Sequence, residues 1–82
     1  MNMQDMENLL IEMAKGLVEN KDAVSVKVDE PNEEGIIVFH LDVADGDKGR
    51  VIGKQGRIAR AIRTIMRAAA NRLGDKVIVD IV

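Results

Sequence analysis

The hydrophobic and polar positions near the start of the chain predict one helix and one strand. Apolar residues recur at helical spacing from Met6 to Leu17 with charged residues between them, which predicts an amphipathic helix that ends near Asn20. Valine then alternates with polar residues over Val24–Val28, the pattern of a half-buried strand. We expect the methionines of the helix to fill the core rather than to bind a ligand.

A turn and a second strand follow. Residues 30–35 combine proline, asparagine, glycine and glutamate, which is strong turn chemistry. The strand after this turn places four apolar side chains on one face: Ile37, Phe39, Leu41 and Val43. Because Ile36 and Val38 occupy its other face, we expect this strand to be covered at least partly on both sides.

The second half of the chain predicts two helices separated by glycines. A short helix is expected over Lys48–Ile52, and a long one runs from Arg57 to Leu73 and stops at Gly74, a good C-terminal cap. At roughly 100° per residue, the apolar side chains of the long helix gather on one side: Ile58, Ile62, Ile65, Met66, Ala69 and Leu73. Three arginines fall within a narrow sector on the opposite side: Arg60, Arg63 and Arg67.

A short apolar strand over Val77–Val82 completes the pattern. The element order is therefore helix-strand-strand-helix-helix-strand, and 82 residues give room for one domain. A single three-stranded sheet with the helices packed on one face is the economical way to bury these apolar stripes. The sequence thus predicts one α+β domain over residues 1–82, but it does not give the order of the strands in the sheet.

The distribution of charge changes this picture. The net charge of −2 by itself argues against a nucleic-acid partner. Of the 12 lysines and arginines, however, eight lie between Lys48 and Arg72, a window without aspartate or glutamate, which leaves four against all 14 acidic residues elsewhere. A segregated basic segment is the electrostatic footprint of a protein that binds phosphates.

A glycine loop inside this window carries the candidate chemistry. Gly53 and Gly56 can adopt backbone angles closed to other residues and allow another backbone to come close. The N-terminus of the following helix offers unpaired N–H groups and a partial positive charge, to which Lys54 and Arg57 add full charges. A G-x-x-G tetrapeptide alone is a weak signal, but the helices on both sides, the basic window and the apolar residues that bracket the loop strengthen it.

The glycine loop and its flanks resemble the signature of the KH domain, through the run Gly49-Arg50-Val51-Ile52-Gly53-Lys54-Gln55-Gly56-Arg57 followed by Ile58 and Ile62. The element order is similar to the type II, prokaryotic arrangement of that domain. A chain this short resembles the small bacterial single-KH-domain RNA-binding proteins of the KhpA (YlqC) type. The resemblance implies that the loop clamps the backbone of about four nucleotides of single-stranded RNA. It also implies homodimers, and pairing with a larger KH-domain protein that has a second nucleic-acid-binding domain.

The resemblance further implies a role for each residue around the loop. The RNA contacts expected from it are Lys48, Arg50, Gly53, Lys54, Gln55, Gly56, Arg57 and Arg60. The glycines shape the loop, the two residues between them project toward the phosphates, and the arginines line the approach. Ile52 and Ile58 either support the RNA groove from below or are plain core residues. A solvated helix face is the better interpretation of Arg63 and Arg67, with distal RNA contact or a partner surface as the alternative.

One feature argues for weak binding. The resemblance implies that the turn between the first two strands borders the RNA groove, and this turn carries Glu30, Glu33 and Glu34, whose carboxylates would repel phosphate. Phe39, the only aromatic residue, shares the apolar face of its strand and is expected in the core. The chain therefore lacks the aromatic stacking platforms that other single-strand binders use, and we expect little sequence preference from one domain.

Enzyme chemistries fit these residues poorly. A nucleotide-binding P-loop needs four residues between its glycines and a hydroxyl after its lysine, whereas this window has three residues and a glutamine at those places. His40 is the only histidine, and no cysteine or second histidine is present to form a nucleophilic pair. Helix capping explains Asp45 and Asp47 better than metal binding does. We therefore expect no enzyme, no metal and no cofactor.

A protein-interaction module is the main alternative. The apolar stripe of the long helix is wide, and a small domain with a thin core gains much from forming an oligomer. Dimerisation through this helix or a sheet edge would then be the main task, with RNA binding secondary. Salt separates the two hypotheses, because an RNA clamp loses affinity steeply as salt rises. A reader of double-stranded DNA is a third alternative, but it leaves the glycine loop without a purpose.

The chain is predicted to be cytoplasmic. Its first residues lack the basic flank and apolar run of a signal peptide. No apolar stretch approaches the roughly 20 residues that a membrane helix needs, and cysteine is absent. We expect neither a membrane nor a small-molecule substrate among its partners.

Overall fold

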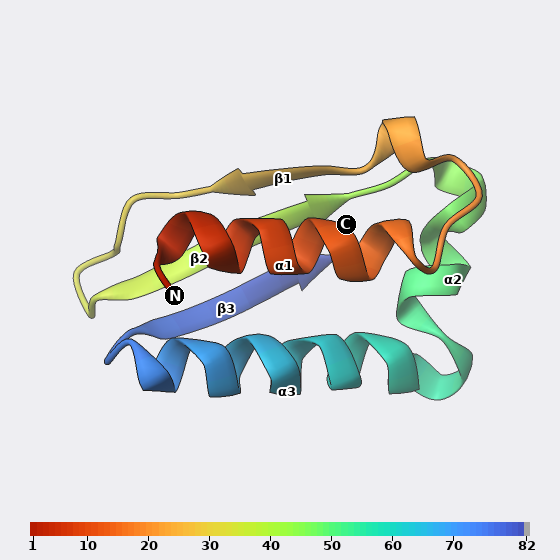
Figure 1. Cartoon of the computed structure of the whole chain (residues 1–82). Coiled ribbons are helices and arrows are strands. Elements are labelled where there is room, and N and C mark those ends of the chain that lie inside the picture. Colours follow the sequence, from red (N-terminus) through yellow and green to blue (C-terminus); the bar gives the residue numbers. More distant parts are fainter. Residues whose placement is uncertain (82) are drawn as a thin grey trace.

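The computed structural model describes residues 1–81 and confirms the predicted α+β fold and element order. Its helices and strands, labelled in Figure 1, are α1 (Met3–Lys15), β1 (Ser25–Val28), β2 (Ile36–Asp42), α2 (Lys48–Ile52), α3 (Arg57–Arg72) and β3 (Lys76–Ile81). Three short 3-10 turns join them: η1 (Lys21–Ala23), η2 (Asp45–Asp47) and η3 (Lys54–Gly56).

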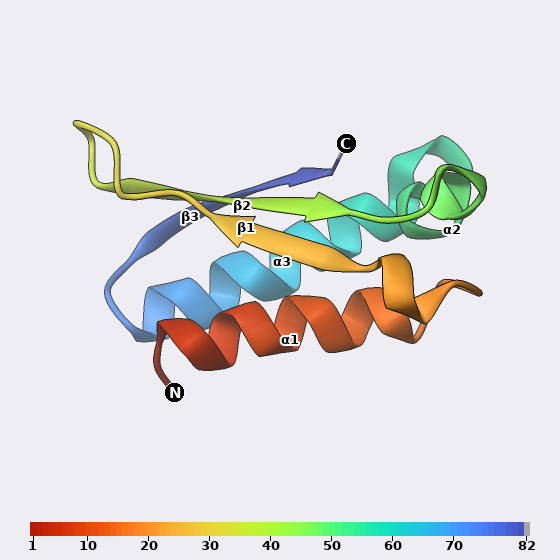
Figure 2. The same cartoon turned by 90° about the horizontal axis from the view of Figure 1, so that it is seen from above.

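The sheet has the strand order β1-β2-β3, which the sequence did not give. β1 pairs with β2 in antiparallel register, with Val28 opposite Phe39, and β2 pairs with β3 in parallel register, with Phe39 opposite Val79. Parallel neighbours need a long crossover, and α2 and α3 supply it. Figure 2 shows α1 and α3 side by side under the same face of the sheet, with α2 beyond the end of β2. The two long helices, α1 and α3, therefore pack on one face, as predicted, and the short helix α2 lies at the end of the sheet.

The first helix begins as expected but ends earlier. Asn2 and Asp5 form a capping box, in which each side chain accepts a hydrogen bond from the other residue's backbone N–H. The predicted end near Asn20 is wrong, since α1 stops at Lys15. The backbone N–H groups of Glu19 and Asn20, which a longer helix would use internally, instead donate to a carboxylate from a distant part of the chain. The helix thus ends at its C-cap Gly16, and a tertiary contact holds the segment that follows.

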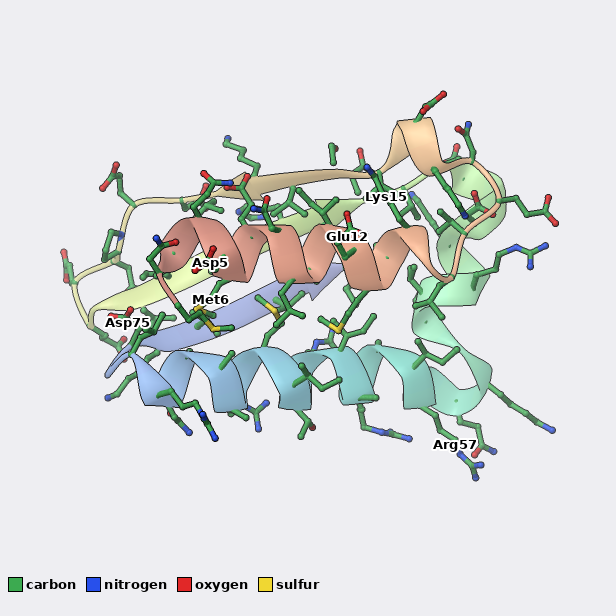
Figure 3. The ribbon with its side chains drawn as sticks, in the orientation of Figure 1. Asp5, Met6, Glu12, Lys15, Arg57 and Asp75 are labelled. Carbon is green, nitrogen blue, oxygen red and sulfur yellow. The ribbon has the colours of Figure 1, made fainter. Side chains whose placement is uncertain are left out.

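The core lies between the helices and one face of the sheet. Its largest fully buried side chains come from every main layer: Phe39, Met6, Leu10, Leu41, Met66 and Val51. Figure 3 shows Met6 between α1 and α3, in agreement with the expectation that methionine fills the core. No element of the described chain covers the other face of the sheet, where Ile36 and Val38 are half-buried and Ile78 is 50% exposed.

The buried side of α3 differs in part from the predicted one. Ile62 and Met66 are buried as predicted, and Ala59 and Ala70 join them. Ile65, which the pattern assigned to the apolar side, is instead 47% exposed. The reason is that α3 packs on both α1 and β3, so small alanines at the contact let the helix approach closely and turn Ile65 outward.

Candidate nucleic-acid interface

The glycine loop between α2 and α3 has a backbone that few residues can adopt. Gly53, Gln55 and Gly56 all have positive φ angles, of 76°, 58° and 74°. The loop closes on itself because the Gly56 N–H donates to the Gly53 carbonyl at 3.1 Å. Gln55 is the only residue other than glycine with a positive φ in the described chain, so it holds a conformation that its side chain disfavours. Such strain gathers at functional sites.

The two glycines are required for different reasons. A Cβ atom built on Gly53 would lie 2.6 Å from Cγ1 and 2.9 Å from Cβ of Ile58, too close for any real contact. A Cβ on Gly56 would meet nothing within 4 Å, so only its positive φ favours glycine there. Gly53 therefore allows the first residues of α3 to approach the loop, whereas Gly56 only allows the turn.

The two isoleucines that bracket the loop have different environments. Ile58 is half-buried and packs against the core, in agreement with the core alternative, and its side chain lies next to Gly53. Ile52 is 39% exposed and lies outside the core, so core packing, one of the two roles predicted for it, is wrong, while support of the RNA groove stays a prediction.

The start of α3 is open to an anion. Its N-cap residue, Gly56, offers no side chain to the first-turn N–H groups, and the first turn contains no acidic residue. Lys54, Arg57 and Arg60 are exposed, and within residues 1–81 none of them forms an ion pair. Figure 3 shows Arg57 pointing away from the body of the protein at this end of α3. A helix N-terminus and three unpaired cations therefore surround one loop.

Two of the predicted contact residues are already paired. Lys48 Nζ lies 3.2 Å from Asp45 Oδ1. The Arg50 guanidinium donates to Glu19 Oε1 at 2.9 Å and lies 3.2 Å from Asp47 Oδ1 through its Nε. The eight predicted residues thus separate into a loop group and a flanking pair, and among the residues that the structure describes only the loop group has charges without an ion pair.

Asp47 is a structural residue that the sequence did not reveal. Its carboxylate is 5% exposed and accepts the backbone N–H groups of Asn20 at 3.0 Å and Glu19 at 3.2 Å. These two hydrogen bonds hold the pKa of Asp47 below its ordinary value. The bond from Asn20 has the larger effect, and Arg50 adds to it. The predicted capping role is wrong, because the side chain accepts no hydrogen bond from the backbone N–H groups at the start of α2. It ties the start of α2 to a segment almost thirty residues away, and no local pattern could indicate that partner.

The two arginines assigned to a solvated helix face behave differently from each other. Arg67 is exposed as predicted. Arg63 is half-buried, and its Nε donates to the Val79 carbonyl at 3.2 Å, so the prediction is wrong for this residue. β3 is an edge strand whose outer carbonyls have no strand partner. Arg63 satisfies one of them.

The acidic turn does not border the glycine loop. Figure 1 shows the turn between β1 and β2 at one end of the sheet, and α2 with the loop that follows it at the other end. The predicted repulsion between Glu30, Glu33, Glu34 and a chain held at the loop is therefore wrong in this fold. No pocket is hollowed over residues 1–81, so a ligand at the loop would lie across an open surface.

In the part of the chain that the structure describes, no cluster of three or more histidine, cysteine, aspartate or glutamate residues has the arrangement of a metal site. None of the helices in this part of the chain combines the length and the apolar character needed to cross a membrane.

Comparison with known proteins decides the family. The sequence profile of the KhpA/KhpB KH domain matches residues 7–81. The chain belongs to this family. It is 49% identical over 77 residues to the RNA-binding protein KhpA of Caldanaerobacter subterraneus and 48% identical over 77 residues to that of Clostridium acetobutylicum, covering 94% of this chain and 100% of each relative. The KhpA of Listeria monocytogenes is 38% identical over 94% of this chain and 99% of its own length. The KH resemblance is thus confirmed.

A solved structure shares the fold of this KhpA/KhpB-family domain. In the crystal structure of Era in complex with MgGDPNP and nucleotides 1506–1542 of 16S ribosomal RNA, 28% of the Era chain superimposes on 93% of this chain. The TM-score is 0.61 and the sequence identity 21%, which supports the common fold alone.

Proposed function

We propose that this protein is a single-KH-domain RNA-binding protein, not an enzyme, that grips short single-stranded RNA through the loop from Gly53 to Gly56. The observation that carries the proposal is a helix N-terminus without a side-chain cap beside the exposed side chains of Lys54, Arg57 and Arg60, none of which forms an ion pair within residues 1–81. Relatives that match 94% of this chain bear the name RNA-binding protein KhpA, which supports the same function.

The proposed grip acts on the RNA backbone. The glycines let a sugar-phosphate chain pass close to the loop, and Lys54 and Gln55 reach its phosphates from the turn. Arg57 and Arg60 follow one turn apart on α3 and extend the positive surface past the loop. Backbone contact of this kind neutralises phosphates without reading bases, so binding is salt-dependent and tolerant of sequence.

In this proposal, Lys48 and Arg50 contribute less to RNA binding than the residues of the loop. Each already has a carboxylate partner, so contact with RNA would replace one ion pair by another. Arg50 also lies against Asp47, the residue that ties α2 to the chain before β1. Its main effect on binding is then to hold α2, and through it the loop, in place.

We also propose that the protein acts as a dimer, either with itself or with a larger KH-domain protein. The exposed side of α3 carries a stripe of small and apolar residues: Ala61, Thr64, Ile65 and Ala68. An isoleucine that is 47% exposed between alanines suits close packing against another helix. Two loops on one dimer would raise the avidity for RNA without a new contact.

The proposed cellular role is that of a post-transcriptional RNA chaperone or regulator in the cytoplasm, where the RNA of a bacterial cell is found. An open surface that grips backbone without a pocket suits transient contact with many RNAs. The alternative, a dimerisation module in which RNA binding is secondary, is favoured by the same exposed Ile65 and is separated by the experiment below.

The proposal is tested by reversing the charge of the loop. A labelled, unstructured RNA is titrated with the wild type, with Lys54→Asp/Gln55→Asp, and with a control of equal charge change away from the loop, Lys76→Asp/Asn8→Asp. Circular dichroism and sizing establish that all three share one fold and one assembly. We expect the loop variant to bind at least tenfold more weakly, the control to bind nearly as the wild type, and wild-type affinity to fall with added salt. Equal binding by the two variants would refute the loop as the RNA clamp.

A further inference from the structure

The uncovered face of the sheet carries a hydrogen-bonded group that the proposed function does not use. His40, on the central strand β2, lies between two carboxylates, one from each edge of the sheet. Its Nε2 is 2.6 Å from Oδ2 of Asp29, the residue just after β1, and its Nδ1 is 3.2 Å from Oδ2 of Asp80 on β3. All three side chains are partly open to water. One imidazole thus bridges all three strands, on the face opposite the helices.

The two contacts can coexist as hydrogen bonds in one protonation state only. An ionised carboxylate only accepts, and a neutral imidazole has a single N–H to donate. A neutral His40 would therefore direct a lone pair at one of the two carboxylates, whereas an imidazolium donates to both. The other charged group in this cluster is Lys27, opposite His40 on β1, which acts on Asp29.

The two ends of the bridge are unequal. The contact to Asp29, at 2.6 Å, has the length of a strong charge-assisted hydrogen bond, whereas the contact to Asp80, at 3.2 Å, has that of an ordinary one. When one proton leaves the ring, the remaining proton is held where the bond is stronger, at Nε2. The lone pair then faces Asp80, so the contact that is lost is the one to β3.

We propose that Asp29, His40 and Asp80 form a proton-dependent clip, which ties both edge strands to β2 when His40 is an imidazolium and releases the C-terminal end of β3 when it is neutral. The clip lies on the face away from the helices, so it does not depend on RNA binding at the loop. β3 carries the Val79 carbonyl that holds Arg63, so release at Asp80 loosens the strand against which α3 packs.

The cluster's titration agrees with this geometry. The hydrogen bond to Asp29, followed by that to Asp80, raises the pKa of His40 above its ordinary 6.5. The same bond lowers the pKa of Asp29, so this carboxylate stays ionised while the ring titrates. The release therefore occurs on the alkaline side of 6.5, within reach of the pH of a cell.

The test is direct because the chain has one histidine, whose ring nitrogens give unambiguous NMR signals. The pKa and neutral tautomer of His40 are measured in the wild type, in Asp29→Asn and Asp80→Asn, and in the control Asp42→Asn on the same strand. We expect a wild-type pKa above 6.5 and an Nε2–H tautomer after deprotonation. Asp29→Asn lowers the pKa most and shifts the proton to Nδ1, Asp80→Asn lowers it less, and the control leaves it nearly unchanged. A wild-type pKa at or below 6.5, or one that neither variant lowers, would overturn the clip.

A second measurement tests the release itself. Amide exchange, expressed as protection factors to remove the intrinsic effect of pH, is followed along β1 and β3. We expect protection near Ile81 to fall in the wild type as His40 deprotonates, while protection in β1 holds. In Asp80→Asn, the amides near Ile81 should at every pH have the low protection factors that the wild type shows when His40 is neutral. Protection of β3 that stays level through the His40 titration would show that no strand is released.

Discussion

The contact beneath Gly53 leads to a sharp prediction about the loop. In Gly53→Ala the new Cβ would lie 2.6 Å from Cγ1 of Ile58, and the backbone angles of 76° and 174° belong to a region restricted to glycine. The strain of such a backbone costs about 1–3 kcal/mol, and forced overpacking costs about 1–3 kcal/mol. We expect Gly53→Ala to lower the free energy of unfolding by about 2–4 kcal/mol.

That loss is large for a domain of this size. A chain of 82 residues is expected to have a total stability of about 4–12 kcal/mol. The matched control is Gly56→Ala, where the Cβ meets nothing within 4 Å and only the left-handed backbone opposes it, at a cost of about 1–2 kcal/mol. The same alanine side chain is introduced in both variants, and only at position 53 does it meet Ile58.

Urea unfolding followed by circular dichroism measures both variants, and anisotropy with labelled RNA measures the consequence for binding. We expect Gly53→Ala to weaken RNA binding more than Gly56→Ala, because a shift of Ile58 displaces the first turn of α3. The double variant Gly53→Ala/Ile58→Ala should be less destabilised than the sum of its parts, since removing Cγ1 and Cδ1 relieves part of the clash. If Gly53→Ala costs no more than Gly56→Ala, or the double variant is additive, the reasoning fails.

Four other outcomes follow from the structure. Phe39→Ala, at a fully buried position, should cost about 3–5 kcal/mol in urea unfolding. Asp47→Asn should unfold at lower temperature and weaken RNA binding, and wild-type stability should fall in acid as Asp47 protonates below its lowered pKa. The raised pKa of His40 adds stability that is complete below pH 6.5 and is lost as pH rises through the folded pKa, a dependence absent in His40→Gln. Ile65→Lys should yield monomers by sizing with an unchanged circular dichroism spectrum, and an unchanged assembly would refute the α3 interface.

The sequence by itself determined the elements and the loop. Alternating and helical apolar patterns fixed the order of helices and strands, because burial of one face depends on local periodicity. The glycines of the loop were also readable, since positive φ and close approach are properties that few other residues supply. The basic window and the KH resemblance together indicated Lys54, Arg57 and Arg60, and the structure leaves these three exposed without an ion pair among the described residues.

Only the tertiary structure decided which residues are engaged by distant partners. Asp47 accepts the N–H groups of residues 19 and 20, Arg63 reaches a carbonyl of β3, and His40 meets carboxylates from both sides of its strand. The acidic turn lies far from the loop because the strand order β1-β2-β3 sends the two to opposite ends of the sheet. Each of these facts depends on contacts between residues well separated in the chain, and a local pattern of polar and apolar residues carries no information about which pairs will meet.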